Sequence, residues 1–254
     1  MTLKRIFELV YVLIYKEWIV KYKRTILGYF WSILYPLFLT VILYFIFSHI
    51  VGIHIPNYFS YLLIGLFVWH WFSNSIMINT GIFYANYSLI KKVNFPRFTL
   101  PLAISIIEMI HFLISLPLIL MALKIDGLYL FKISWILYIP LLLLLELILI
   151  FSLSLIFGMF NVLFRDIERL VSMLLLILFY LTPIFYSEKM IPDQFKIFFY
   201  LNPMFYIVNL WREVLIQGNL NIKYCIISVV YISFLLLIAI IFYKKINPKI
   251  PEIL

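Results

Sequence analysis

The sequence predicts an all-α integral membrane protein. Of its 254 residues, 66 % are hydrophobic and only 12 % are charged, whereas a soluble domain has about 45–50 % apolar and about 25 % charged residues. A soluble chain of this size could not bury so much apolar surface. The apolar runs are continuous rather than alternating, which argues against a transmembrane β-barrel. Because about 20 helical residues cross a bilayer, the whole of 1–254 is expected to form one transmembrane domain with six transmembrane helices.

The first element is an N-terminal interfacial amphipathic helix, expected within residues 1–27. Its apolar residues recur at helical spacing and lie opposite Lys4 and Glu8, which is the pattern of a helix lying in the membrane interface. Lys16 and Glu17 directly follow the apolar run, and no small-residue cleavage site is present, so we do not expect a cleavable signal. The apolar positions are Leu3, Ile6, Phe7, Val10, Leu13 and Ile14.

Six apolar stretches follow, and the cations between them predict their orientation. Six Lys and Arg residues precede the first stretch, three lie between the second and third, two between the fourth and fifth, and three after the sixth. The opposite side carries six. The positive-inside rule therefore predicts that both termini are cytoplasmic, and we expect a multi-pass protein of the cytoplasmic (inner) membrane. The predicted spans are 29–51, 59–81, 100–123, 134–164, 170–186 and 224–243.

The net charge of +9 is explained by this orientation signal and by attraction to anionic membrane lipids. No soluble basic domain is present, so we expect no nucleic-acid partner.

Residues 190–218, between spans 5 and 6, predict a re-entrant external helical hairpin. The segment is apolar, but Asn202 and Pro203 divide it into pieces that are too short to cross. Broken backbone at this depth needs cover from protein or from a water-filled cavity. We therefore expect an external gate that includes Asn202, Pro203 and Arg212, with a hairpin that merely caps the bundle as the alternative.

The motifs of soluble catalysis are missing from the sequence. There is no Gly-Lys pair, hence no P-loop for ATP, and no HExxH, CxxC or GxSxG. We expect no catalytic residues, no metal and no cofactor in this chain. Three ionisable residues fall inside spans, where an unpaired charge is costly; a structural hydrogen bond is favoured for them over a proton relay. They are Glu108, His111 and Glu146.

Aromatic residues make up 20 % of the chain and continue through the spans instead of stopping at the interfaces. Aromatic faces pack against sugar C–H groups, and Tyr and Trp add a polar edge. A conduit lined this way would let a glycan slide, although ordinary packing explains any single residue equally well. The candidate channel residues are Tyr35, Phe38, Tyr44, Trp69, Phe72, Phe179, Tyr180 and Phe185.

A series of motifs, in order along the chain, resembles the ABC-2 type permease subunits of polysaccharide exporters, among them the O-antigen and teichoic acid export permeases. The resemblance extends to about Gly218. The motifs are RTILGYFW at 24–31, LYP at 34–36, YFSYLLIGL at 58–66, LIKKVNFPR at 89–97, FRDI at 164–167, LTPIFY at 181–186 and NPM at 202–204.

The resemblance implies a homodimer bound to two copies of a separate ABC ATPase subunit, which would hold ATP and Mg. The substrate would be a polysaccharide linked to polyprenyl pyrophosphate. Residues 82–99 would form the cytoplasmic coupling loop, with Leu89, Lys91, Lys92, Phe95, Pro96 and Arg97 contacting the ATPase. Lipid headgroups would be met by Lys21, Lys23, Arg24 and Gly28. Residues 1–27 would be either an anchor or a wall of the transport path.

Three alternatives stay open. The chain could export a smaller lipid or drug, it could be a membrane-embedded transferase using a polyprenyl-linked glycan, or it could be a passive channel or scaffold.

Overall fold

The computed structural model describes residues 3–22, 30–128 and 132–253, and their regular structure is entirely helical. The long helices are α1 (Leu3–Tyr22), α2 (Phe30–Phe45), α3 (Tyr58–Thr80), α6 (Thr99–Ile125), α7 (Trp135–Leu163), α8 (Ile167–Tyr180), α10 (Pro203–Arg212) and α11 (Ile222–Ile246). The short ones are η1 (Ile46–Ile50), α4 (Ile82–Ala85), α5 (Tyr87–Lys92), η2 (Glu188–Met190), η3 (Asp193–Phe195), α9 (Lys196–Tyr200), η4 (Glu213–Gln217), η5 (Asn247–Lys249) and α12 (Ile250–Ile253).

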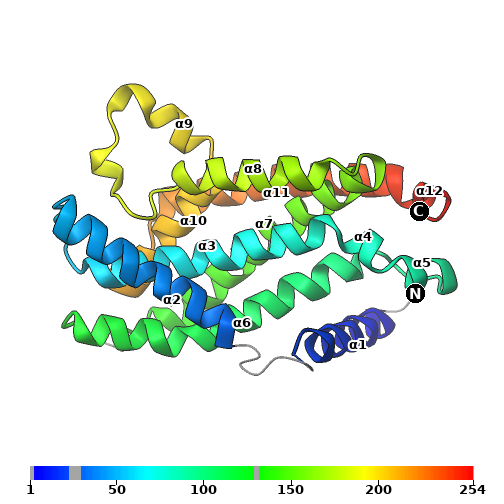
Figure 1. Cartoon of the computed structure of the whole chain (residues 1–254), viewed down its shortest axis with the longest axis horizontal. Helices are drawn as coiled ribbons and strands as arrows, with labels where there is room; N and C mark the ends of the chain where they lie inside the picture. Colours follow the sequence, from blue (N-terminus) through cyan, green and yellow to red (C-terminus); the bar gives the residue numbers. More distant parts are fainter. Residues whose placement is uncertain (1–2, 23–29, 129–131, 254) are drawn as a thin grey trace.

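Within the described residues, five helices are long and apolar enough to cross a membrane: α2 with η1, α3, α6, α7 and α11 with η5. The predicted fifth span corresponds to α8, which has 14 residues and is about 21 Å long at 1.5 Å per residue. It runs beside α3 and α7 along the bundle (Figure 1). Because α8 alone is too short to cross a bilayer, a fifth crossing would have to include the irregular segment that follows it. The number of six membrane spans therefore stays a prediction.

Helix α3 is the centre of the bundle. It packs against α2, α6, α7, α8 and α10, and 67 % of its most apolar window is buried, against 11 % for α2 with η1 and 17 % for α11. The peripheral helices therefore carry the apolar side chains that face outward, which suits a protein dissolved in lipid.

Polar side chains join the central helices where backbones come close. The Asn79 amide of α3 donates to Ser105 Oγ of α6 (3.2 Å) and to Ser154 Oγ of α7 (2.9 Å). On α7, a Cβ at Gly158 would lie 3.0 Å from the Asn79 carbonyl and 2.9 Å from the Phe83 ring. Small residues and shared hydrogen bonds are how helices associate in a membrane, where the hydrophobic effect does not favour one apolar contact over another.

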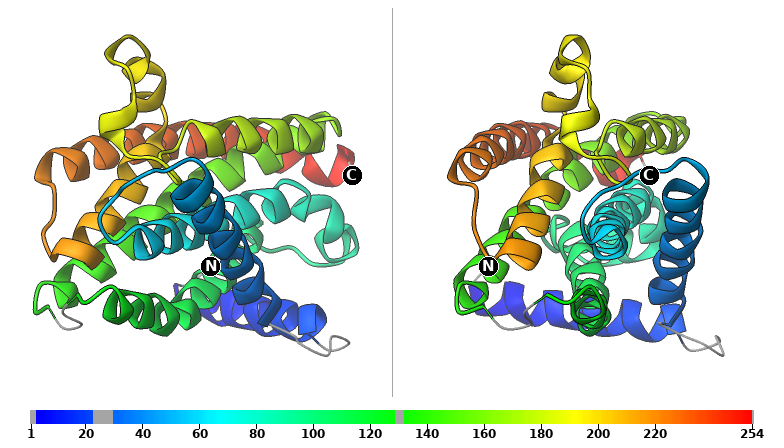
Figure 2. Two further views of the ribbon diagram at one scale, coloured as in Figure 1. Left: turned by 60° about the vertical axis from the view of Figure 1, so that its left-hand side comes forward. Right: turned by 90° about the vertical axis from the view of Figure 1, so that its left-hand side faces the viewer.

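Helix α1 confirms the predicted N-terminal helix. Figure 2 shows it lengthwise in the view in which α3 is nearly end-on, so it runs across the bundle. It packs against α6. Val10 and Leu13 of the predicted stripe are buried, whereas Phe7 is 74 % exposed. This orientation is that of a helix lying along a membrane surface.

The segment between α8 and α11 is broken at the predicted place. The Asn202 side chain accepts a hydrogen bond from Met204 N, and Pro203 occupies the first turn of α10, where a missing N–H costs nothing. The first half is not one helix: η2, η3 and α9 form an arm that projects from the bundle (Figure 1). Pro192, between η2 and η3, disfavours helix at the residue before it.

Candidate functional site

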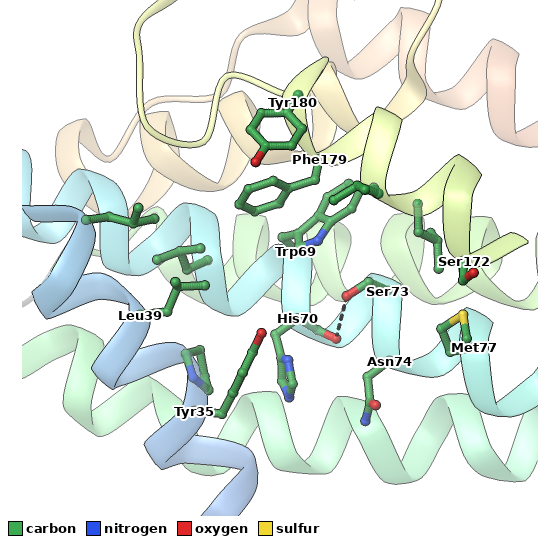
Figure 3. A pocket seen from close by; sticks show the side chains of 15 residues that line it. Tyr35, Leu39, Trp69, His70, Ser73, Asn74, Met77, Ser172, Phe179 and Tyr180 are labelled. Carbon is green, nitrogen blue, oxygen red and sulfur yellow. Dashed lines mark hydrogen bonds between the residues drawn. The ribbon is translucent and has the colours of Figure 1, made fainter. Parts of the chain in front are cut away.

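A cavity of about 560 Å³ lies between α2, α3 and α8. Figure 3 shows Tyr35 beside His70, with Trp69 below Phe179 and Tyr180. The lining residues are Tyr35, Pro36, Leu39 and Leu43 from α2; Leu66, Trp69, His70, Ser73, Asn74 and Met77 from α3; and Ser172, Leu175, Leu176, Phe179 and Tyr180 from α8. No Asp, Glu, Lys or Arg is among them. The wall therefore suits an uncharged molecule that has both apolar faces and hydroxyl groups.

The aromatic rings of this cavity hold one another in place. Ring centroids are 5.6 Å apart for Tyr35 and His70, and 5.7 Å apart for Trp69 and Phe179, which meet edge-to-face. These are favourable distances for ring pairs. On α2, Pro36 lacks the backbone donor that an interior position normally supplies, and the Thr40 hydroxyl donates to its carbonyl (2.7 Å). Contacts between helices thus keep the wall in a defined shape.

The structure brings together four of the eight predicted channel residues: Tyr35, Trp69, Phe179 and Tyr180 line this cavity. The Phe185 ring stands 6.0 Å from both Phe179 and Tyr180, farther along the chain. The other three lie elsewhere. Phe38 is 60 % exposed, Phe72 is 1 % exposed within the core, and Tyr44 lines a separate pocket that includes the start of α3. For Phe72 the core position leaves no surface for a substrate, so ordinary packing is its role.

Sequence reasoning missed the polar strip of the cavity. His70, Ser73 and Asn74 line it at i, i+3 and i+4 on α3, with the apolar Met77 following at i+7, which is one face of a helix. Scanning the second span for polar residues at this spacing would have found them.

Asn74 also connects the cavity wall to the ionisable pair predicted on α6. Its amide donates to Glu108 Oε2 (2.7 Å), and His111 Nδ1 lies 3.2 Å from the same oxygen. Both Glu108 and His111 are buried, and the Trp18 ring of α1 lies 5.5 Å from the imidazole. Glu146 is separate, because its Oε2 accepts from Trp211 Nε1 of α10 (2.7 Å). Each carboxylate thus has a structural partner from another helix.

The segment predicted to form the hairpin is fixed to the bundle by Arg212, which is 4 % exposed. Its guanidinium donates to three backbone carbonyls: Tyr61 O through Nε (3.1 Å), Pro183 O through Nη1 (2.5 Å) and Ile184 O through Nη2 (2.7 Å). The Tyr61 ring lies under it, 3.5 Å from Cζ, as in a cation–π contact. Arg212 thus joins α10 to α3 and to the segment after α8.

Gly65 makes this contact possible. A Cβ at that position would collide with Arg212 Nη2, so only glycine lets the guanidinium lie against α3. Neither the burial of Arg212 nor this use of Gly65 could be seen in the sequence.

Asn202 makes a second connection to the end of α8. Its Nδ2 donates to Thr182 Oγ1 (2.8 Å), and Thr182 in turn donates to the Leu178 carbonyl of α8 (2.7 Å). The hydroxyls of Tyr58 and Tyr61 donate to the carbonyls of Phe185 and Tyr186, at 2.7 and 2.9 Å. The irregular backbone after α8 is therefore covered by side chains from α3 and α10.

The last turn of the hairpin is held by the start of α7. Trp135 Nε1 donates to Val214 O (2.8 Å), Ser134 Oγ donates to Gly218 O (2.6 Å), and Lys132 Nζ donates to Ile216 O. Burial lowers the pKa of Lys132 below its usual value. The Val214 carbonyl also accepts from Gly218 N, whereas the Ile216 carbonyl in the last turn is among those that a helix end leaves to side-chain donors.

The predicted coupling residues lie at the opposite end of the bundle, around α4 and α5. Lys91 and Lys92 are exposed and Leu89 and Pro96 are half-buried, whereas Phe95 is buried in the core. Arg97 does not point freely outward: its Nη1 donates to the Asn247 carbonyl and lies 3.2 Å from Asn247 Oδ1. The loop is thus braced against the end of α11.

Of the predicted headgroup residues, Lys23, Arg24 and Gly28 lie outside the described residues, as does the side chain of Lys21, which belongs to α1. Among the residues that the structure describes, no group of three or more His, Cys, Asp or Glu side chains could hold a metal ion.

Comparison with known proteins identifies the family. The model of the ABC-2 type transporter family matches residues 8–216. The chain belongs to this family. Two proteins of Klebsiella pneumoniae, each named O-antigen export system permease protein RfbA, are 38 % identical to the chain over 251 residues, which is 98 % of this chain and 96 % of theirs. A protein of the same name from Myxococcus xanthus is 28 % identical over 183 residues, 72 % of this chain and 69 % of its own. The resemblance of the motifs to ABC-2 type permeases is confirmed.

Replacing Arg212 tests how the hairpin is fixed. We expect Arg212→Lys to keep the charge but to leave at least one of the three carbonyls without a donor, at a cost of about 1–3 kcal/mol for each group left unpaired. The thermal midpoint of the purified protein should fall, and backbone amides of 203–217 should exchange hydrogen faster. The matched control is Lys196→Arg on the projecting arm, which should change neither. Equal protection of 203–217 in both variants would show that Arg212 does not hold the hairpin.

Proposed function

We propose that this chain is the transmembrane permease subunit of an ATP-driven ABC exporter that moves lipid-linked, O-antigen-like polysaccharide across the cytoplasmic membrane. The observation that carries the proposal is the uncharged cavity between α2, α3 and α8, whose wall combines Tyr35, Trp69, Phe179 and Tyr180 with a polar strip. Such a wall fits sugar rings better than ions. The names of the relatives support the same substrate class.

A homodimer would complete the channel. The two helices that border the cavity on its outer sides, α2 and α8, expose large apolar side chains such as Trp31, Phe38, Leu170 and Ile177. In a bilayer these faces meet lipid or a second copy. Two copies joined through them would place their cavities opposite each other and form one continuous path.

ATP would be hydrolysed, with Mg, by two copies of a separate ATPase subunit, because the chain has no P-loop. Residues 82–99 are the proposed docking loop. Lys91 and Lys92 are exposed, with the Lys91 ammonium 4.5 Å from the Tyr87 ring centroid, while Arg97 connects the loop to Asn247 at the end of α11. A displacement of the loop would therefore reach α6, which follows it, and α11 together.

At the end of the bundle opposite the docking loop, the hairpin that contains Asn202, Pro203 and Arg212 would act as the external gate.

The headgroup of the substrate would be met before the first span. The polyprenyl pyrophosphate would enter beside Lys21, Lys23, Arg24 and Gly28, since Arg and Lys are natural phosphate partners.

The position of the carboxylates argues against a glycan transferase. Glu108 contacts Asn74, Glu146 contacts Trp211, and Asp126 contacts the Ser60 backbone. They occupy three separate places instead of one membrane face, so no acid–base pair forms among them.

Charge reversal at the docking loop tests the partner. We expect the purified chain alone to hydrolyse no ATP and to co-purify with its ATPase subunit. Lys91→Glu combined with Lys92→Glu should reduce co-purification several-fold, because complementary charge guides such interfaces. The matched control is Lys223→Glu, which changes a cation in the first turn of α11, at the other end of the bundle. ATP hydrolysis by the isolated chain, or full assembly of the double variant, would contradict this docking mode.

Truncating the exposed cavity aromatics tests the path. Tyr35→Ala and Tyr180→Ala remove exposed rings and should therefore leave folding and ATPase assembly intact. We expect each to lower the amount of glycan translocated per ATP in proteoliposomes several-fold. Phe234→Ala, an equally exposed ring on α11, should not. If all three variants transport alike, the cavity is not the route.

A further inference from the structure

A second pocket, of about 470 Å³, lies at the outer ends of α2, α3 and α6. It shares no residue with the transport cavity. In Figure 1 these helix ends lie at the end of the bundle away from α5 and α12. Its lining residues are Tyr44, Ser48, Ile53, His54, Ile55, Pro56, Asn57, Tyr58, Phe59 and Asp126. We call it the outer pocket.

Aromatic rings form one part of the outer pocket. The Tyr44 ring centroid lies 5.6 Å from that of Phe59, edge-to-face, and 6.0 Å from that of Tyr58. Tyr58 is fixed by its hydrogen bond to Phe185 O. The rings are thus held by one another and by the bundle, and they offer the apolar surface on which sugar C–H groups pack.

Polar groups form the other part. Asp126 Oδ2 accepts from Ser60 N of α3 (3.2 Å), which orients the carboxylate, and among the described residues Oδ1 has no donor. His54 Nδ1 lies 2.7 Å from the Gly52 carbonyl. Since a carbonyl only accepts, Nδ1 carries the proton and Nε2 of the neutral ring is an acceptor. The Ser48 hydroxyl and the Asn57 amide add donors and acceptors.

The backbone around the outer pocket is also unusual. Residues Ile46–Ile50 form a π-helical turn, and Asn57 is the one described non-glycine residue with positive φ, at 55°. Asn57 precedes α3 but its side chain does not cap the helix. Such conformations persist only where surrounding structure maintains them, and they concentrate at functional sites. Here the π-helical turn and Asn57 lie in the connection between α2 and α3, whose residues line the outer pocket.

The lining contains a carboxylate and neither Lys nor Arg, so a phosphate group would be repelled. Carboxylate, amide and imidazole acceptors beside aromatic rings instead match a hydroxyl-rich ring. We propose that the outer pocket binds a saccharide unit, supplied by the exported glycan after it has left the bundle. This inference rests on the proposed function. A retained sugar at this position would hinder the chain from sliding back.

Binding by the full-length protein in nanodiscs tests the proposal. The probe is the glycan of the host strain, released from its lipid by mild acid and titrated with detection by saturation-transfer NMR. We expect saturable binding, weakened about tenfold by Asp126→Asn, since a hydrogen bond to a charged group contributes roughly that factor. Asn57→Gly should weaken it too, and should fold because glycine adopts positive φ without strain.

The matched control is Asp193→Asn, an exposed carboxylate on the projecting arm that pairs with Lys196; it should bind like the unchanged protein. Equal affinity in all variants, or no binding by the unchanged protein, would overturn the proposal. So would equally tight binding of phosphoethanolamine. The saccharide could also come from a membrane glycolipid, so a second set of nanodiscs contains monoglucosyl diacylglycerol. Binding of this lipid without binding of the released glycan would overturn the assignment of the pocket to the exported glycan.

ATP-driven translocation is measured on the same variants together with the ATPase subunit. Translocation by the unchanged protein without any binding of the released glycan would refute this inference alone, whereas absence of any ATP-driven translocation would refute the proposed function.

Discussion

The structure depends on one constraint: backbone carbonyls that a helix leaves unpaired inside a bilayer must find donors within the protein. Helix α8 ends at Tyr180, and the segment after it contains Pro183. Arg212 supplies two donors to this segment, to the Pro183 and Ile184 carbonyls, and a third to the Tyr61 carbonyl of α3, while Asn202 reaches the segment through Thr182. The position of the hairpin segment and the glycine at 65 both follow from that pairing.

The same arrangement limits how the protein could move. The hairpin shares its hydrogen bonds with α3 and with the end of α8, so these parts would shift together unless several buried bonds break. By contrast, α2 lies at the edge of the bundle with only 11 % of its apolar window buried. In the transport cycle that we propose, the wall made by α2 is the part whose displacement costs least, while the contacts of α3 with α6 and α7 stay fixed.

The sequence sufficed for the elements that local chemistry dictates. Continuous apolar runs identified the long helices, and the Asn202–Pro203 pair identified the start of α10, because a cap and a proline act within one turn. It did not suffice where partners are distant in the chain. The sequence predicts Arg212 to be one of the external loop cations, since an arginine is ordinarily exposed, whereas its burial depends on the carbonyls of Pro183 and Ile184. Phe72 and Trp69 are both aromatic residues of the same helix, yet Phe72 lies in the core and Trp69 lines the cavity. The outer pocket joins Asn57 to Asp126, which only folding brings together.

Cysteine labelling tests most directly whether α8, together with the segment that Arg212 binds, crosses the membrane. In a Cys225→Ser background, single cysteines replace Asp166, just before α8, and Gln194, on the projecting arm; both positions are exposed. A membrane-impermeant maleimide is applied to right-side-out and to inverted vesicles. The account predicts that the cysteine at 166 reacts only in inverted vesicles and the cysteine at 194 only in right-side-out ones. Reaction of both from the same side would contradict it.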